Sequence, residues 1–493
     1  MNRPIRTLAA GFLLLFVAVM GRATYLQFFD AASLSSVSDH PGNVRAATDE
    51  FSRQRGTIIV DGKPIAVSMP ISGVYKYQRT YPFGAEYAQI TGYFSLGYGL
   101  GGIESSQNKA LSGEDDKLFL RRLSDILANK PTPGENVVLT LNAAAQKAAY
   151  DGLRGKIGSV VAIEPSTGRI LAMVSTPSYN PNALAVHNSG QVSATKTRLL
   201  NRKPSPLDNP AIQTIVPPGS TFKLITAAAA LSSGRYTPNS LVPGASRMRL
   251  PLSSNYLTNE NGYSCGANQV TLTVALERSC NVAFGTVGGA LGVHALNTQA
   301  EKFGFGQTYF NELNDSLVSQ SASNFPANAD APGTVLAAIG QGNVAATPLQ
   351  MALVAAGIAN GGVVMKPYLV SEVDAANLDV VYRASPGPIN DMQPAISPSV
   401  ASDLTQMMVQ VVQNGTGTTA QIPGIQVAGK TGTAQSAASR PPYAWFVSFA
   451  PADNPKVAVA VLIQDAGVER NQISGAGLAA PIAKAVMQAV IGR

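Results

Sequence analysis

Serine and lysine occur three times at the spacing Ser-x-x-Lys in this sequence of 493 residues. On a helix this spacing places the hydroxyl and the amine on one face, so the lysine can accept the serine proton during attack on a carbonyl. The pairs are Ser106 and Lys109, Ser193 and Lys196, and Ser220 and Lys223. The spacing alone does not choose among them.

The context of Ser220 distinguishes it from the other two serines. It follows Pro217-Pro218-Gly219 and precedes an apolar stretch, Thr221 to Leu231, which is followed by Gly234. We therefore expect a long helix with Ser220 at its N-terminus, where the helix dipole and free NH groups favour an oxyanion. The alternative is that Ser220 only caps the helix.

A second candidate motif is Ser279-Cys280-Asn281. Its hydroxyl can relay protons, and its amide can hold a substrate peptide group. Two other Ser-x-Asn triplets match equally well, but only this one follows an expected apolar helix, Val270 to Arg278, and stands between the other two motifs. Those triplets begin at Ser178 and Ser253.

The third motif is Gly429-Lys430-Thr431-Gly432-Thr433, which follows an expected apolar strand, Ile425 to Ala428. The glycines allow a ligand backbone to lie against a strand edge. Lys430 and the two threonines suit an anion, and no Asp or Glu occurs from Asn414 to Ala452. A substrate carboxylate would meet no competing charge from this segment. A solvated loop lysine is the alternative interpretation.

In this order, the three motifs resemble the signatures of penicillin-binding proteins and serine β-lactamases. Ser159 to Asn180, Ile339 to Gly362 and Trp445 to Pro451 extend the resemblance to a penicillin-binding transpeptidase domain over about Gly134 to Arg493. Arg55-Gly56-Thr57-Ile58 and Gly102-Ile103-Glu104 resemble the N-terminal region of class B enzymes. That region is smaller than in many of them and is similar to that of penicillin-binding protein A of actinomycetes. Gln435 departs from the Glu that many class B enzymes carry.

The resemblance implies an α/β (α+β) chain with the penicillin-binding transpeptidase or serine β-lactamase-like fold, an antiparallel sheet flanked by helices. It also implies a peptidoglycan D,D-transpeptidase that cross-links stem peptides and is acylated by β-lactams. Ser220 would be the nucleophile, and Lys223 the base, with a pKa lowered by burial and by Lys430. Ser279 would return the proton to the leaving amine.

Substrate binding would fall to the remaining motif residues. Asn281 would hold the peptide group, and Lys430, Thr431, Gly432 and Thr433 would bind the terminal carboxylate. The backbone NH groups of Ser220 and Thr433 would form the oxyanion hole.

Three alternatives to the transpeptidase remain open. A D,D-carboxypeptidase would use water as the acceptor. A β-lactamase or β-lactam sensor needs a base that activates water, and no acid lies between Asn209 and Asn259. An inactive scaffold would only recruit wall-synthesis or division proteins, which we also expect as partners of the enzyme.

The pattern of apolar segments predicts the elements that position these motifs. Strands are expected at 56–60 and 65–69 around the turn Asp61-Gly62, and at 137–141, 158–164, 169–175, 444–449 and 457–463. Helices are expected at 143–153 and 476–491. The Pro-Thr-Pro-Gly segment 131–134 separates a small mixed N-terminal domain (31–133) from the transpeptidase domain (134–493).

Residues 1–30 are expected to be a cytoplasmic stub and a signal anchor. Arg3 and Arg6 precede an apolar run from Thr7 to Phe29 that only Arg22 interrupts. The run can span a bilayer if Arg22 snorkels, and the preceding charges place the catalytic domain outside the cytoplasm. We therefore expect a single-pass protein of the bacterial cell membrane. A cleaved signal peptide is the alternative.

Composition excludes several other classes. The net charge is +7 without a long Lys/Arg run, so we expect no nucleic-acid binding. Three widely spaced histidines and two cysteines supply no local metal motif, so no metal or cofactor is expected. In an exported domain Cys265 and Cys280 can form a disulfide, and two buried free thiols are the alternative.

Overall fold

The computed structural model describes residues 3–28, 44–114, 133–390, 393–435 and 440–492. At its centre lies a five-stranded sheet of order β15-β16-β17-β7-β8 in which every neighbouring pair is antiparallel. The strands are β7 (Ile157–Ile163), β8 (Ile170–Thr176), β15 (Ala428–Ala434), β16 (Tyr443–Ala450) and β17 (Val457–Asp465). The expected antiparallel sheet and its β7–β8 hairpin are confirmed.

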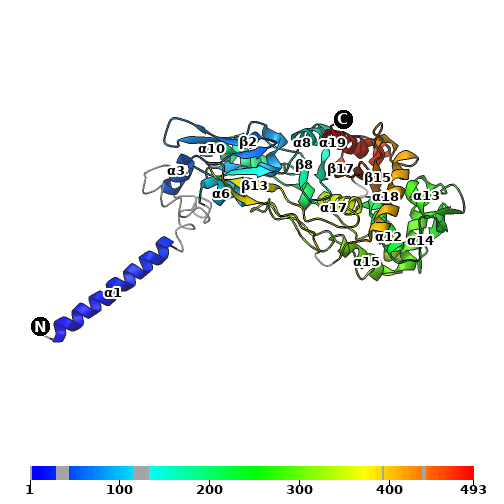
Figure 1. Ribbon diagram of the computed structural model, residues 1–493, viewed down its shortest axis with the longest axis horizontal. Helices are drawn as coiled ribbons and strands as arrows, with labels where there is room; N and C mark the ends of the chain where they lie inside the picture. Colours follow the sequence, from blue (N-terminus) through cyan, green and yellow to red (C-terminus); the bar gives the residue numbers. More distant parts are fainter. Residues whose placement is uncertain (1–2, 29–43, 115–132, 391–392, 436–439, 493) are drawn as a thin grey trace.

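Both faces of this sheet are buried under helices (Figure 1). In β17, Val459 and Val461 pack into one apolar cluster with α8 (Ala143–Gly152) and α19 (Ala480–Ile491). The alternate residues of the strand, such as Ala460, join the larger cluster that contains the three helices α12 (Lys223–Ser232), α17 (Pro348–Ala359) and α18 (Pro398–Gln413). Side chains alternate between the faces of a strand, so a strand covered on both sides is apolar at every position.

The helix after the candidate nucleophile differs from the expectation. A 3-10 turn, η3 (Gly219–Phe222), holds Ser220, and the α-helix α12 begins only at Lys223. The serine therefore lies one turn before the α-helix. From Lys223 to Leu231 every residue of α12 is buried, which explains why Lys223 and Thr226 are the only polar residues in this stretch.

A second sheet has six strands in the order β14-β13-β6-β1-β2-β3. The turn Asp61-Gly62 joins β1 to β2 as expected, and β1 pairs in parallel with β6. The strands are β1 (Ile58–Val60), β2 (Lys63–Pro70), β3 (Tyr77–Thr80), β6 (Asn136–Leu139), β13 (Val370–Asp374) and β14 (Val380–Arg383). This sheet combines strands from both sides of the expected boundary at 133/134, and that boundary stays a prediction.

The two N-terminal stretches that resemble class B enzymes meet in one buried ion-pair cluster. The Glu104 carboxylate lies 2.6 Å from Arg55 Nε through one oxygen and 2.6 Å from Arg79 Nε through the other. All three side chains are nearly inaccessible to solvent. Two guanidinium partners balance the cost of burying this carboxylate.

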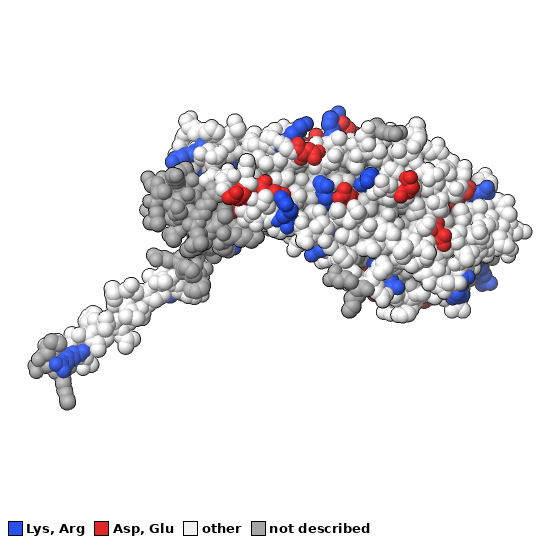
Figure 2. Space-filling view, in the orientation of Figure 1, with Lys and Arg blue, Asp and Glu red and all other residues white. Residues whose placement is uncertain are grey.

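The N-terminal helix α1 (Arg3–Phe28) lies apart from the folded body (Figure 1). Its segment Ile5–Leu26 has a mean hydropathy of 1.8, and none of it is buried. Figure 2 shows no charged side chain on the visible face of the middle of this helix, and the sequence has none from Thr7 to Gly21. By length and composition α1 can cross a membrane. Phe29 and the boundary residues Pro131 and Thr132 fall outside the described residues.

Short elements surround the second motif. β9 (Leu241–Pro243) pairs with β12 (Gln269–Thr271), and β10 (Arg247–Arg249) pairs with β11 (Tyr256–Thr258). Val270 was expected in a helix but belongs to β12, and the helix α13 (Leu272–Glu277) begins after it. α14 (Asn281–Leu291) follows. The longer of the remaining helices are α3 (Val44–Ser52), α10 (Ser189–Asn201), α15 (Val293–Lys302) and α16 (Ala331–Ala337).

Candidate active site

The structure brings Ser220 and Lys223 into direct contact. Lys223 Nζ lies 3.0 Å from Ser220 Oγ. The turn that carries the serine is fixed from both sides, because Gly219 N donates to Gly340 O at 2.9 Å and Trp445 Nε1 donates to Pro217 O at 3.0 Å. Gly219 has a φ of +54°, a conformation that favours glycine.

Four oxygen atoms surround the Lys223 amine. Besides Ser220 Oγ, they are Ser279 O at 2.6 Å, Asn281 Oδ1 at 2.7 Å and Ser279 Oγ at 3.2 Å. The carbonyl and the amide oxygen can only accept, so they engage the two N–H groups of a neutral amine. The lone pair of Lys223 Nζ then remains free to accept the hydroxyl proton of Ser220. The site thus suits an uncharged lysine that acts as a base toward Ser220.

A hydrogen bond from Asn281 Nδ2 sets the orientation of the Asn281 amide. Asn281 Nδ2 donates to Thr258 O at 2.9 Å, which directs Oδ1 toward Lys223. The amide assignment therefore rests on two hydrogen bonds that agree. Asn281 is half-buried, so it can also meet a substrate at the surface of the site.

Ser279 connects the two lysines of the site. Lys430 Nζ donates to Ser279 Oγ at 2.9 Å, and the same hydroxyl lies 3.2 Å from Lys223 Nζ. Ser279 has a φ of +59°, which is uncommon for a residue other than glycine. A backbone held in this conformation at a functional site is a recognised device for presenting a side chain.

Burial dominates the electrostatics of both lysines. Desolvation lowers the pKa of Lys223 well below its usual value, and the neighbouring Lys430 lowers it further. Desolvation also lowers the pKa of Lys430, to about 7. The carboxylate of Glu260 raises the pKa of both lysines and so acts against burial. The expected influence of burial and of Lys430 on Lys223 is thus present in the structure.

The third motif lies inside a strand, so the strand expected at 425–428 was misplaced, and the buried Lys430 excludes the alternative of a solvated loop lysine. β15 begins at Ala428 and includes Lys430, Thr431, Gly432 and Thr433. Seven residue pairs with β16 define it, and its other edge pairs with no strand among the described residues. An edge strand offers backbone groups to an extended ligand, which is the use that the motif predicted.

Small residues let β15 approach the turn of the nucleophile. A Cβ at Gly432 would lie 2.9 Å from Thr221 Cγ2 and 3.0 Å from Pro218 O. A Cβ at Gly219 would lie 2.8 Å from Thr433 O. Thr433 therefore lies against the residue that precedes Ser220, where the oxyanion hole was expected.

Sequence reasoning missed two residues near the motifs. Thr416 Oγ1 is hydrogen-bonded to Thr431 Oγ1 at 2.6 Å, so a third threonine hydroxyl, besides those of Thr431 and Thr433, joins the expected carboxylate site. Glu260 acts electrostatically on both lysines, although it directly follows the segment that we noted for its lack of acids. The motif spacing identified neither residue, because Thr416 lies in a turn and Glu260 begins the short 3-10 helix η4 (Glu260–Gly262), both outside the motifs.

The other two Ser-x-x-Lys pairs do not form such a site. Ser106 Oγ donates to Glu312 O at 2.6 Å, and Tyr98 OH donates to Ser193 Oγ at 2.9 Å. Lys196 is buried with its pKa lowered to about 8 by desolvation, yet its amine is hydrogen-bonded to Tyr93 OH. A matching spacing and a lowered pKa are therefore not sufficient without the neighbouring motifs.

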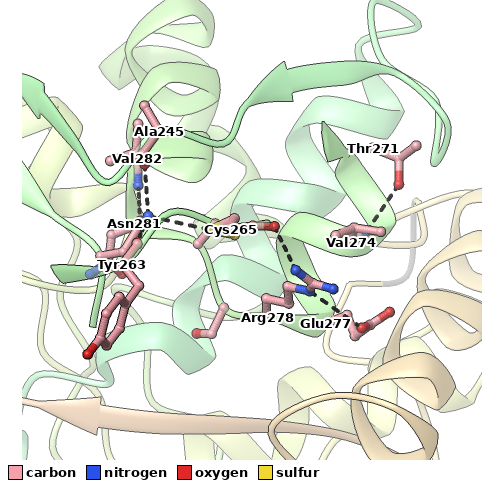
Figure 3. Close-up of a disulfide and its surroundings, with 12 residues drawn as sticks. Ala245, Tyr263, Cys265, Thr271, Val274, Glu277, Arg278, Asn281 and Val282 are labelled. Atoms are coloured by element: carbon pink, nitrogen blue, oxygen red, sulfur yellow. Dashed lines mark hydrogen bonds and ion pairs between the residues drawn. A yellow bond between two sulfur atoms is a disulfide. The ribbon is translucent and has the colours of Figure 1, made fainter. Parts of the chain in front are cut away.

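A disulfide joins Cys265 to Cys280, with their Cα atoms 6.1 Å apart (Figure 3). It connects the second motif to the loop that follows β11. Arg278 Nη1 also donates to Cys265 O at 3.0 Å, so two links hold this loop beside the motif. The loop and the motif therefore form one local unit.

Comparison with known proteins agrees with this geometry. Residues 158–488 match the penicillin binding protein transpeptidase domain, and residues 55–137 match the penicillin binding protein A dimerisation domain. The chain belongs to the penicillin-binding protein transpeptidase family. Both matches support the resemblance to class B penicillin-binding proteins that the motifs indicated.

Relatives of this penicillin-binding transpeptidase align along its whole length. It is 41% identical over 500 residues to peptidoglycan D,D-transpeptidase PbpA of Mycolicibacterium smegmatis, covering 100% of this chain and 99% of the relative. The ceftriaxone acyl-enzyme complex of penicillin-binding protein A from Mycobacterium tuberculosis has a TM-score of 0.85 at 39% identity, covering 90% of this chain and 100% of that one. The corresponding imipenem acyl-enzyme complex has a TM-score of 0.84 at 40% identity, with the same coverage. The expected fold is confirmed.

Proposed function

We propose that this protein is a peptidoglycan D,D-transpeptidase that acts through a Ser220 acyl-enzyme and is inhibited by β-lactams. The observation that carries the proposal is the convergence of Lys223 and Lys430 on Ser279, with Lys223 Nζ 3.0 Å from Ser220 Oγ. The full-length relatives bear the name peptidoglycan D,D-transpeptidase, and the similar solved structures are β-lactam acyl-enzymes.

Acylation begins with proton transfer from Ser220 Oγ to the neutral Lys223 amine. Oγ attacks the carbonyl carbon of the penultimate D-alanine, and the oxyanion binds the NH groups of Ser220 and Thr433, each worth ~3 kcal/mol. The C–N bond then breaks, and the departing nitrogen takes a proton through Ser279. Terminal D-alanine leaves with a free amine, and an ester remains on Ser220.

The substrate is held by the other motif residues. Lys430 and the hydroxyls of Thr431 and Thr433 face the terminal carboxylate, Asn281 holds the peptide group, and the glycine at 432 lets the peptide lie along β15. Thr416 supports this anion site through its hydrogen bond to Thr431. Together these contacts position the scissile bond over Ser220.

Transfer completes the reaction. The amine of a neighbouring stem peptide attacks the ester carbonyl, gives one proton to Lys223, and displaces Ser220 Oγ, which regains its proton. A new amide cross-link forms. Water in place of the amine would make the enzyme a carboxypeptidase.

We further infer that α1 anchors the protein in the cell membrane as a single span, with the catalytic part outside the cytoplasm. Its length and hydropathy support the anchor, and the preceding Arg3 and Arg6 support the orientation. We also propose that proteins of wall synthesis or division bind to the N-terminal region. Deletion of residues 1–30 should give a soluble protein that still binds penicillin, and a folded truncated protein without penicillin binding would contradict the role of α1 as an anchor alone.

Product analysis tests the central activity. The protein is incubated with lipid-linked precursor and a polymerase, and the muropeptides are separated after digestion. Cross-linked dimers that vanish with penicillin support the transpeptidase, whereas trimmed monomers alone would identify a carboxypeptidase. A covalent penicillin label that decays within minutes would instead identify a β-lactamase, and a protein that never takes up the label would be a scaffold.

A further inference from the structure

The segment that ends in Glu260 is fixed beside the second motif by two hydrogen bonds. Asn281 Nδ2 donates to Thr258 O at 2.9 Å, and Val282 N donates to Asn259 Oδ1 at 3.0 Å. Asn259 is buried and also donates to Ala245 O. Glu260 is therefore carried on a well-supported backbone, two residues after Thr258, whose carbonyl holds the Asn281 amide that contacts Lys223.

The side chain of Glu260 is nevertheless exposed to solvent. Within the described part of the chain, its carboxylate makes no hydrogen bond or ion pair. It is also the one acidic group, among the described residues, that acts electrostatically on both Lys223 and Lys430. An exposed carboxylate therefore follows, by two residues, the carbonyl of Thr258 that holds the Asn281 amide, and it acts electrostatically on both lysines.

The two substrates of a transpeptidase have opposite charges at the ends that enter the site. The donor ends in a carboxylate, which the two lysines and the threonines of β15 suit. The acceptor is a primary amine, which carries a positive charge at neutral pH. An exposed acidic side chain beside the second motif complements the charge of the acceptor and repels that of the donor carboxylate.

We propose that Glu260 is a positioning residue that recruits the ammonium group of the acceptor to the acyl-enzyme; this inference rests on the proposed transpeptidase function. The ammonium ion pairs with the Glu260 carboxylate, loses one proton to water, and then attacks the ester carbonyl on Ser220 as a neutral amine. The new C–N bond replaces the C–O bond to Ser220. Glu260 thereby favours amines over water as acceptors.

The experiment compares a cationic and an uncharged acceptor on the same acyl-enzyme. A thioester donor that ends in acyl-D-alanine acylates the full-length enzyme, and Nα-acetyl-lysinamide or hydroxylamine then competes with water. Hydroxylamine is uncharged at neutral pH. The variants are Glu260→Gln and, as a charge-matched control on the exposed end of α15, Glu301→Gln.

Glu260→Gln should lower the rate constant for transfer to Nα-acetyl-lysinamide by roughly threefold to fivefold relative to hydroxylamine, as expected for one exposed charge pair. Added salt should reduce this transfer in the wild type and in Glu301→Gln, but not in Glu260→Gln. Equal loss with both acceptors and with water would overturn the recruiting role and indicate a general effect on the site. An unchanged acceptor ratio would overturn it too.

The experiment distinguishes an error in the proposed transpeptidase function from an error in the role of Glu260. A wild-type enzyme that forms the acyl-enzyme and releases it only to water would overturn the transpeptidase and, with it, the role of Glu260. A wild-type enzyme that transfers to amines while Glu260→Gln behaves identically would overturn the role of Glu260 alone.

Discussion

Lys430 Nζ donates to Ser279 Oγ across 2.9 Å, although 151 residues separate the two in the sequence. The same hydroxyl lies 3.2 Å from Lys223 Nζ, so a charge on Lys430 is felt by Lys223. Burial is the main cause of the lowered pKa of Lys223, and a residue of β15, far along the chain, lowers it further.

This relationship predicts how acylation depends on pH. Lys223 must be neutral to accept a proton, and burial together with Lys430 lowers its pKa. Removal of the second cation in Lys430→Met should raise the pKa of Lys223 and shift the acidic limb of the acylation profile to higher pH. Stopped-flow measurement of penicillin acylation from pH 5 to pH 10 gives the profile. A limb that stays in place or shifts to lower pH would contradict the coupling.

Burial of Lys430 should lower the free energy of unfolding at neutral pH. Its pKa is about 7 in the folded state and higher when unfolded, so between these values the unfolded chain binds more protons and stability rises with pH. Lys430→Met should therefore raise the Tm at pH 7, and the gain should shrink toward pH 10. Calorimetry at the two pH values measures this, with the exposed Lys302→Met as a control. A lower Tm at pH 7 would mean that the hydrogen bonds of Lys430 outweigh its desolvation.

Close packing of β15 on the nucleophile turn predicts a steric variant. Gly432→Ala adds a Cβ 2.9 Å from Thr221 Cγ2, which must move the strand or the turn. A displacement near 1 Å at a reacting centre costs about a hundredfold in rate, so penicillin acylation should fall by that order. Gly387→Ala, whose added Cβ meets no atom within 4 Å, is the matched control. Equal acylation rates in the two variants would refute the tight approach of β15.

The disulfide predicts a local effect of reduction. The chain-entropy estimate for a loop of this length is ~3 kcal/mol, and the bridge ends inside the second motif. Mild reduction should slow penicillin acylation more than it lowers the Tm, because Ser279 and Asn281 lose a local constraint. The double variant Cys265→Ala, Cys280→Ala controls for the reductant itself. Native acylation by the reduced protein would make the bridge purely structural, and two free thiols in the unfolded, unreduced protein would exclude it.

The sequence predicted correctly those elements that depend only on residues close together in the chain. The turn Asp61-Gly62 and the doubly buried strand β17 both follow from patterns within a few residues. β15 was misplaced because its glycines and threonines have little apolar character, and its strand form depends on pairing with β16. Thr416 escaped notice because its hydrogen bond to Thr431 joins two segments that only the fold brings together, and the electrostatic effect of Glu260 on the two lysines likewise depends on the fold.

The candidate site was predictable through order and context. Ser-x-x-Lys occurs three times in the sequence, and Lys196, which belongs to one of the other pairs, also has a lowered pKa. Neither the spacing nor a lowered lysine pKa therefore identifies the reactive pair. The motifs at Ser279 and Lys430 singled out Ser220, and the structure places these three residues together. Their distances and the φ of Ser279 could not be read from the sequence, since each depends on long-range packing.

Mass-spectrometric mapping of the penicillin adduct tests the central claim most directly. The protein is labelled, digested and searched for the acylated peptide, with Ser220→Ala as the control for labelling. We predict a single adduct on Ser220 and none in the Ser220→Ala variant, which should remain folded. An adduct on Ser106, Ser193 or any other residue of the wild-type protein would contradict the assignment of Ser220 as the nucleophile.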